Sequence, residues 1–191
     1  MTTTRAGILI FTAAVLAGPW YSVAEYNPLT HVISLLGAQN TPNSFIMVAG
    51  FLALGFSIFI DGMREFNKPV IPFMAFGIFT GLAGLLAHKP IAPSLAHNEL
   101  MHQAHSLLAT LAGISITVGL LWQAALLPAS WRRIMTIVLA VLCFALPLSM
   151  LAFEDSQGLI QRCMYLLIFA WLWNYYPFKL QKSRERKTNA E

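Results

Sequence analysis

Six apolar stretches, separated by short polar segments, make up most of this chain. They run roughly over residues 6–23, 44–60, 70–86, 106–126, 134–153 and 163–178. A helix needs about 20 mostly apolar residues to cross a bilayer, because the hydrocarbon offers no water to an open backbone. The second and third stretches are close to the lower limit of that length. We therefore predict an all-α bundle of six transmembrane helices that forms one domain over residues 1–178.

The composition supports a membrane location. Hydrophobic residues make up 57% of the chain and charged residues only 10%, whereas about a quarter of the residues in a soluble domain are charged. The first apolar stretch continues past Pro19 without a small-residue cleavage site, which favours a retained span over a signal peptide. Cys143 and Cys163 lie inside apolar stretches, so we expect packed side chains rather than a disulfide framework.

The short segments between the stretches differ in charge. One side of the predicted membrane would receive ten basic residues, which are Arg5, Arg64, Lys68, Arg132, Arg133, Lys179, Lys182, Arg184, Arg186 and Lys187. The other side would receive only Lys89 and Arg162. Cytoplasmic loops carry the excess of Lys and Arg, so we predict a multi-pass inner-membrane protein with both termini in the cytoplasm. The basic tail, residues 179–191, is expected to contact anionic lipid headgroups, and no pattern indicates nucleic-acid binding.

The same orientation places all the histidines at one face. His31, His88, His97, His102 and His105 fall on the extracytoplasmic side, and so do Glu25, Glu99, Glu154 and Asp155. The cytoplasmic segments contain basic residues with Asp61 and Glu65 but no histidine. This asymmetry predicts that a functional site, if the chain has one, lies at the extracytoplasmic face.

A short interfacial helix is predicted after the first span, over residues 28–37. Asn27 can cap it, Pro28 suits its first position, and Gly37 can end it. His31 and Ser34 lie three residues apart and so share its polar side. The alternative interpretation is that both are merely solvated or capping groups.

The segment "AHNELMHQAHSLL", residues 96–108, holds the densest polar pattern. We predict that a helix begins near Ser94 or Asn98 and continues unbroken into the fourth span. Glu99, His102 and His105 then step three residues at a time, within an arc of about 120°. Glu-x-x-His is a spacing by which one helix supplies two metal ligands. The alternative is a set of interfacial histidines bonded to carbonyls and water, and we interpret His88 and His97 as loop residues.

The third extracytoplasmic segment, "FEDSQGLIQRCMY", brings Arg162 to the level of Glu154 and Asp155. An arginine at the mouth of a span needs a partner. A structural ion pair with one of these carboxylates is one interpretation. The other is a clamp for a phosphate or carboxylate head group.

Three motifs carry a resemblance to a known family. "THVISLLGAQNTPNSFIMVAGFLALG" is similar to a His-x-x-Ser-x-Leu-Gly loop followed by a Gly-bearing span, "HQAH" to a His-rich helix start, and "GLIQRCMYLLIFAWLW" to a Gly-x-x-Glu-Arg pattern before a Trp-bearing last span. The chain thereby resembles a family of bacterial and archaeal six-span membrane proteins known as domain of unknown function 998. Gln161 stands where that pattern has glutamate. The resemblance implies a fold and a set of polar positions rather than a reaction.

Three functions fit these residues. The first is a metal-dependent hydrolase of a lipid or lipid-linked substrate, in which a zinc-like divalent ion activates water. Its predicted metal ligands are His31, His102 and His105. Its predicted catalytic residues are Glu99 or Glu154 as general base and Ser34 at the oxyanion, and its predicted substrate-binding residues are Arg162 and Asp155.

The second function is non-catalytic. The same polar groups would bind a lipid, a quinone or another small molecule, in a transporter or an accessory membrane protein. The third is a haem protein with axial ligands from two segments, His105 paired with His31 or His88. All three functions require the extracytoplasmic segments to converge on a common pocket.

Overall fold

The computed structural model describes residues 2–92 and 94–175. Within them the chain is all-α, without strands, as predicted. Its elements in order are α1 (Thr3–Tyr21), η1 (Ile33–Gly37), α2 (Phe45–Arg64), η2 (Lys68–Val70), α3 (Ile71–Leu85), α4 (Glu99–Leu126), α5 (Trp131–Ala152), η3 (Glu154–Ser156) and α6 (Gln157–Asn174), where η denotes a 3₁₀ helix. Each apolar stretch corresponds to one α-helix, and the basic tail predicted over residues 179–191 lies outside the described residues.

Four segments in the described part of the chain are long and apolar enough to cross a membrane. They are Phe45–Arg64, Lys68–Leu85, Glu99–Leu126 and Trp131–Ala152. The other two helices, α1 and α6, span 19 and 18 residues and are not among the four. In α6, polar residues interrupt the apolar sequence at Gln157, Gln161, Arg162 and Asn174. The four apolar segments support a membrane protein, while the count of six spans stays a prediction.

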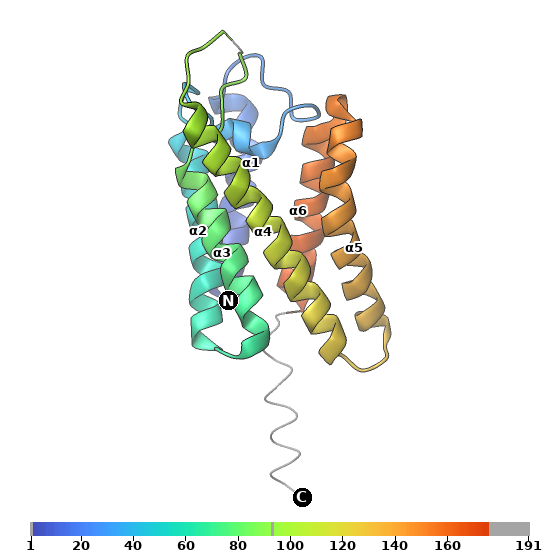
Figure 1. The fold of residues 1–191 in the computed structure, drawn as a ribbon. Coiled ribbons are helices and arrows are strands. Elements are labelled where there is room, and N and C mark those ends of the chain that lie inside the picture. Colours follow the sequence, from blue (N-terminus) through green and yellow to red (C-terminus); the bar gives the residue numbers. More distant parts are fainter. Residues whose placement is uncertain (1, 93, 176–191) are drawn as a thin grey trace, which may run out of the picture.

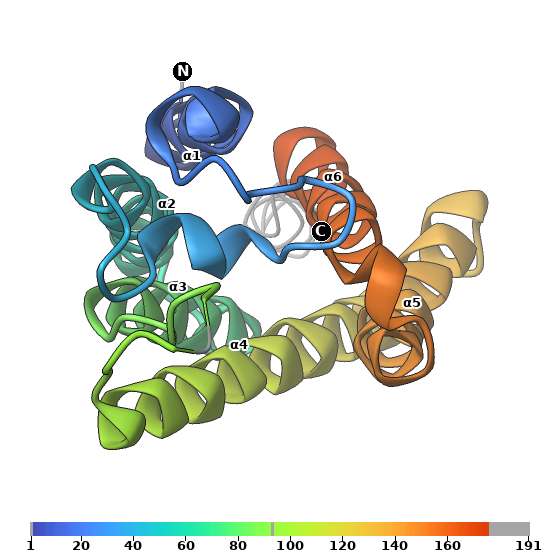
Figure 2. The same ribbon diagram turned by 90° about the horizontal axis from the view of Figure 1, so that it is seen from above.

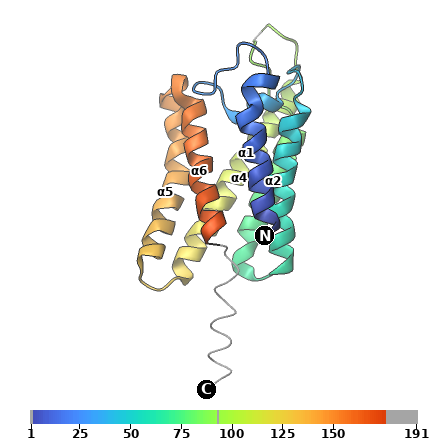
Figure 3. The same cartoon turned by 180° about the vertical axis from the view of Figure 1, so that it is seen from behind.

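The six α-helices form a ring in chain order. Each helix contacts the next one along the chain, and α6 returns to contact α1, as the view from above shows (Figure 2). The first and last described helices begin and end at the same end of the bundle (Figure 3). There Arg5 Nη2 donates to the carbonyl of Trp173 at 2.9 Å. The predicted placement of both termini on the cytoplasmic side agrees with this arrangement but is not established by it.

Small residues let α2 and α3 pack closely. A Cβ added to Gly77 would lie 2.6 Å from the carbonyl oxygen of Gly55, so the two backbones touch where these glycines cross. On the other side of α2, Phe11 of α1 packs edge-on against Phe51, with ring centroids 5.2 Å apart. Phe11 also contacts Tyr165 and Phe169 of α6. These contacts hold α1, α2, α3 and α6 together as one packed unit.

Helix α4 crosses the bundle diagonally. It begins beside α3 and ends at the turn of residues 127–130, from which α5 returns (Figure 1). Asn98 caps its first turn by accepting a hydrogen bond from the Met101 amide at 3.1 Å, and the helix runs unbroken to Leu126. The predicted helix start at Asn98 is thus confirmed. Because α4 leans away, α4 and α5 diverge toward the end that carries the long loops.

Candidate functional site

The segment between α1 and α2, residues 22–44, covers one end of the ring, and we call it the cap segment. Its 3₁₀ helix η1 crosses the centre of the ring when the bundle is viewed from above (Figure 2). Ile33 and Leu36 are 1% and 0% exposed, and Ser34 is buried beside them. The cap segment is therefore part of the core at this end of the bundle.

The predicted helix over residues 28–37 is shorter than expected and begins only at Ile33. Asn27 does cap the preceding turn, because its side chain accepts from the Leu29 amide at 2.9 Å. The backbone then leaves the helix. The amide of Ile33 donates to Gln161 Oε1 at 2.5 Å, and the carbonyls of Pro28 and His31 bond to Arg162. These backbone amide and carbonyl groups thus find their hydrogen-bond partners on α6 and not within a longer helix.

Arg162 is the main link between α6 and the cap segment. Its Nη1 donates to the carbonyls of Pro28 at 2.6 Å, His31 at 3.1 Å and Gly158 at 2.9 Å, and its Nη2 donates to the Tyr26 hydroxyl. The guanidinium is thus bonded to the protein's own backbone. Neither ion-pair partner suggested by the sequence, Glu154 or Asp155, contacts Arg162 in the described structure, and both are exposed.

A glycine permits this contact between α6 and the cap segment. A Cβ at Gly158 would collide with the carbonyl oxygens of His31 and Pro28. The close approach lets the first amides of α6 find partners, since Leu159 N donates to the carbonyl of Leu29 at 2.9 Å. The free N–H groups at the start of α6 are thereby bonded to the cap segment.

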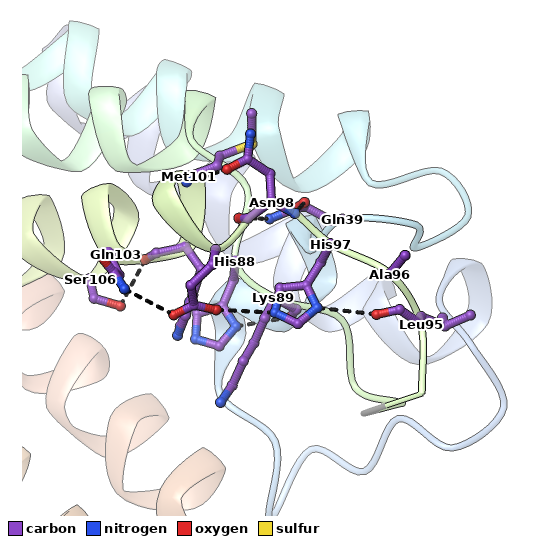
Figure 4. Close-up of polar contacts among 12 residues, drawn as sticks. Gln39, His88, Lys89, Leu95, Ala96, His97, Asn98, Met101, Gln103 and Ser106 are labelled. Atoms are coloured by element: carbon purple, nitrogen blue, oxygen red, sulfur yellow. Dashed lines mark hydrogen bonds and ion pairs between the residues drawn. The ribbon is translucent and has the colours of Figure 1, made fainter.

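Hydrogen bonds also join the cap segment to the segment between α3 and α4, residues 86–98. Gln39 Oε1 accepts from the Asn98 amide at 2.7 Å, and Gln39 Nε2 donates to the Asn98 carbonyl at 3.0 Å (Figure 4). The Gln39 amide donates to the His88 carbonyl at 2.9 Å, and Asn40 Nδ2 donates to the carbonyl of Ala96 at 2.9 Å. The segments 22–44 and 86–98, two of the three that were predicted to be extracytoplasmic, therefore lie side by side.

Three histidines meet where these segments reach α4. The ring of His88 packs edge-on against His102, with centroids 4.3 Å apart, and against His105, with centroids 5.3 Å apart. Burial lowers the pKa of His88 to about 4, and the neighbouring His105 and His102 act in the same direction. His88 is consequently neutral at neutral pH. The sequence interpretation of His88 as a mere loop residue missed this cluster.

Three further residues of the polar pattern, His97, Glu99 and His31, make contacts of their own. His97 Nδ1 contacts the carbonyl of Leu95 at 3.1 Å (Figure 4), and His97 Nε2 contacts Glu99 Oε2 at 3.2 Å. His31 belongs to the cap segment, where its Nδ1 accepts from the Asn27 amide at 2.9 Å and its ring lies 5.8 Å from that of Tyr26. Burial lowers the pKa of His31 as well.

Metal binding by His31, His102 and His105 stays a prediction. Within residues 2–92 and 94–175, no three His, Cys, Asp or Glu side chains form a group that could hold a metal ion. Haem binding also stays a prediction. His31 contacts Asn27 and Tyr26, whereas His102 and His105 contact His88. The structure therefore gives no common site built from His31, His102 and His105.

A cavity of about 680 Å³ lies inside the ring of helices. Most of its wall is apolar and comes from α3, α4, α5 and α6. Closer to the end of the bundle that holds the termini, Phe73 of α3 stacks on Trp171 of α6, with ring centroids 5.6 Å apart and ring planes 2° apart. The Trp171 indole N–H donates to Thr136 Oγ1 of α5 at 3.0 Å. These aromatic contacts join three helices below the cavity.

Several polar side chains in the cavity wall come from elements close to the cap segment, whereas the hydroxyls of Thr110 and Thr117, which also line it, donate to carbonyls of α4 itself. Ser34 comes from η1, His105 from the first turns of α4, and Gln157 and Gln161 from the first turns of α6. His105 is 5% exposed, and its Nδ1 lies 2.8 Å from the carbonyl oxygen of Ala83 and 2.7 Å from that of Leu86. None of the described residues that line the cavity is charged.

The cavity is open toward the side of the bundle. Four of its lining residues remain about half exposed, and they lie on the two diverging helices at Ile114, Val118, Phe144 and Leu148. Figure 1 shows α4 and α5 separating above the 127–130 turn. The opening therefore faces the direction from which a lipid layer would contact the helices.

Two of the predicted site residues, Ser34 and His105, share this cavity. The lining residues do not include the other six, which are His31, Glu99, His102, Glu154, Asp155 and Arg162. The sequence interpretation missed Thr110, Gly113 and Gln161. A signal was available, because small or polar residues at 109, 112, 113 and 117 follow His105 on one side of α4.

The comparisons with known proteins identify a family but add no chemistry. No curated protein and no solved structure matches the chain. A model of one protein family does match, over residues 5–174, and this range includes all the motifs quoted above. The chain therefore belongs to the family described as protein of unknown function DUF998.

Proposed function

We propose that this chain is an integral membrane protein of six spans that binds an amphiphilic molecule, taken up from the bilayer, in its central cavity. The observation that carries the proposal is the cavity itself. Most of its wall is apolar, it has Ser34, His105, Gln157 and Gln161 on the side of the cap segment, and it is open to the side. A ligand of matching form has an apolar chain and a small polar head.

The size and lining of the cavity support binding. Sites for small molecules commonly have about 300–1,000 Å³, with mostly apolar walls and a few polar groups that orient the ligand. At about 680 Å³ the cavity falls within this range. Ser34 and His105 would receive the head group, because both lie in the wall on the side of the cap segment.

The lateral opening supports access from the lipid. Ile114 of α4 is 55% exposed and Phe144 of α5 is 65% exposed, although both belong to the cavity wall. An apolar chain can pass between such side chains without entering water. The cap segment, by contrast, is bonded to α6 and to residues 86–98, which disfavours access from the aqueous side.

Binding fits the contacts better than hydrolysis. None of the described residues in the cavity wall is a carboxylate that could act as general base. Glu99 instead contacts His97 and Gln103. A metal-dependent hydrolase that uses Glu99 or Glu154 stays a prediction, which no contact in the described part of the chain favours.

Filling the cavity tests the proposal. Gly113 lines it, and a Cβ added there meets nothing within 4 Å, so Gly113→Phe starts its side chain from open space and should fill part of the cavity. The protein is purified in mild detergent, and the bound amphiphiles are extracted and identified by mass spectrometry. The wild type is expected to retain a stoichiometric amphiphile, and Gly113→Phe is expected to lose most of it.

Ala145→Phe is the matched control, because Ala145 is exposed on α5 and does not belong to the cavity wall. This variant adds the same ring to the bundle and should retain the amphiphile at the wild-type level. Equal amounts of every amphiphile in all three proteins would overturn the proposal.

A further inference from the structure

The histidine in the cavity wall has a fixed hydrogen-bonding polarity. His105 Nδ1 faces two carbonyl oxygens, Ala83 O at 2.8 Å and Leu86 O at 2.7 Å. A carbonyl oxygen only accepts hydrogen bonds, so Nδ1 must carry the ring proton and donate it. The other ring nitrogen, Nε2, is then an acceptor in the neutral imidazole.

Nε2 of His105 has no hydrogen-bond partner among the residues that the structure describes. The side chain is 95% buried, since only 5% of it is exposed, and it belongs to the cavity wall. Nε2 can therefore accept a hydrogen bond from a molecule in the cavity. Because most of the wall is apolar, a ligand that donates to Nε2 gains a bond that few other groups there can offer.

The charge of the cavity wall restricts the ligand further. The described lining residues include no Lys, Arg, Asp or Glu. Arg162, the nearest basic residue of α6 to the cap segment, donates its hydrogen bonds to backbone carbonyls and to Tyr26. A phosphate or carboxylate head would therefore be buried without a counter-charge, which is costly.

Donors are also available elsewhere in the cavity wall. Ser34 is 8% exposed, and its hydroxyl makes no hydrogen bond to a described residue. Gln161 uses its Oε1 to accept from the Ile33 amide at 2.5 Å, which leaves its amide N–H groups for another partner. A hydroxyl group can donate to one neighbour and accept from another at the same time.

Resting on the proposed function, we infer that the cavity selects uncharged amphiphiles with a hydroxyl head group, and that His105 Nε2 accepts the hydrogen bond from that hydroxyl. The ligand class is thus a long-chain alcohol or a lipid with a free hydroxyl. Phospholipids and free fatty acids in their charged form are excluded by the same contacts. His105 distinguishes a hydroxyl from its ether, because an ether oxygen has no proton to donate.

Two photoreactive probes test this inference on the whole protein in detergent. The probes are a 16-carbon alcohol with a diazirine in mid-chain and the methyl ether of the same compound. After irradiation, labelled peptides are located by mass spectrometry. We expect the alcohol to label peptides from the cavity wall at about tenfold lower concentration than the ether, as one buried hydrogen bond implies. Gly113→Phe should abolish this labelling for both probes.

Two variants of His105 examine its role. His105→Gln can still donate to the carbonyls of α3 and accept from a hydroxyl, and should keep part of the preference for the alcohol. His105→Phe cannot accept a hydrogen bond, and should label equally with both probes. His97→Phe is the matched control, since His97 is exposed and bonds to Leu95 and Glu99. It should retain the wild-type preference.

The outcomes separate the two proposals. Equal labelling of the wild-type cavity by alcohol and ether, abolished by Gly113→Phe, would overturn the selection of a hydroxyl while leaving the proposed binding function intact. Labelling of the wild type by neither probe within the cavity wall would overturn the binding function itself. The wild-type comparison alone decides between these outcomes if His105→Phe fails to fold.

Discussion

Arg162 Nη1, on α6, donates a hydrogen bond of 2.6 Å to the carbonyl of Pro28, which lies 134 residues earlier in the chain. The same guanidinium bonds to the carbonyl of His31 and to the hydroxyl of Tyr26. One side chain thus holds the cap segment on α6. In the described structure it satisfies backbone carbonyls, where the sequence suggested either an ion pair with Glu154 or Asp155 or a head-group clamp.

Replacing Arg162 with Gln should therefore destabilise the protein. The carbonyls of Pro28 and His31 lose a charged donor, and we expect the free energy of unfolding to fall by about 2–4 kcal/mol. The measurement is thermal unfolding in detergent, combined with limited proteolysis of residues 22–32, which should be cleaved faster. Arg133→Gln is the control, because Arg133 is exposed. Equal melting temperatures for both variants would show that Arg162 does not anchor the cap segment.

Acid should weaken the loop end of the bundle through His88. Burial lowers the pKa of His88 from 6.5 to about 4 in the folded protein. Between these values the unfolded chain binds a proton that the folded protein does not, so stability is complete above pH 6.5 and is lost as the pH falls toward 4. The loss should reach roughly 2–3 kcal/mol. His31 contributes in the same direction.

His88→Phe checks this pH dependence, because phenylalanine retains a flat ring against His102 and His105 without a titrating nitrogen. Thermal unfolding is measured from pH 7.5 to pH 4.5. The stability of the wild type should fall over this range more steeply than that of His88→Phe, whereas His97→Phe should follow the wild type. Identical slopes for the wild type and His88→Phe would contradict the assignment.

The helices could be predicted from the sequence, because each depends on a local property. An apolar stretch of about 20 residues carries its own signal, and caps such as Asn98 act within one turn. The cap segment shows where local reasoning fails. Asn27, Pro28 and Gly37 all suit a helix over residues 28–37, yet Arg162 and Gln161, more than 120 residues away, bond to the backbone that the helix would have used.

The candidate site depends on the same long-range contacts. The sequence placed Ser34 and His105 on one face of the membrane, and both belong to the cavity wall. It could not predict that His105 Nδ1 would bond to the carbonyls at the end of α3, or that His88 would replace His31 as the neighbour of His102 and His105. Helical spacing gives the relative positions of residues on one helix, but not which loop packs against them.

A buried carboxylate at the opposite end of the bundle should stabilise the start of α1. Asp61 of α2 is 3% exposed, and its Oδ2 accepts from the Thr4 amide at 2.7 Å and from the Thr4 hydroxyl at 2.8 Å. An anion beside a helix N-terminus is favourable, because the first N–H groups have no partners within the helix. Asp61→Ala should lower the free energy of unfolding by about 2–3 kcal/mol.

Chemical or thermal unfolding in detergent measures this effect. Asp61→Asn is expected to recover part of the lost stability, because its amide oxygen can still accept from the Thr4 amide. Glu25→Ala serves as the control, since Glu25 is exposed. Were Asp61→Ala as stable as the wild type, the carboxylate would have no role at the start of α1.

Two glycines provide a test of the cavity that needs no ligand. Gly113 of α4 has open space where a Cβ would lie, whereas at Gly77 of α3 an added Cβ would lie 2.6 Å from the carbonyl oxygen of Gly55. Alanine in a helix interior is favoured over glycine by about 1 kcal/mol. Gly113→Ala should therefore raise the free energy of unfolding by up to that amount. Gly77→Ala should lower it by about 1–3 kcal/mol, because α2 and α3 must separate.

The unfolding of the two variants and the wild type is measured in one detergent under the same conditions. If Gly113→Ala lost as much stability as Gly77→Ala, the space beside Gly113 would have to be filled by packed side chains.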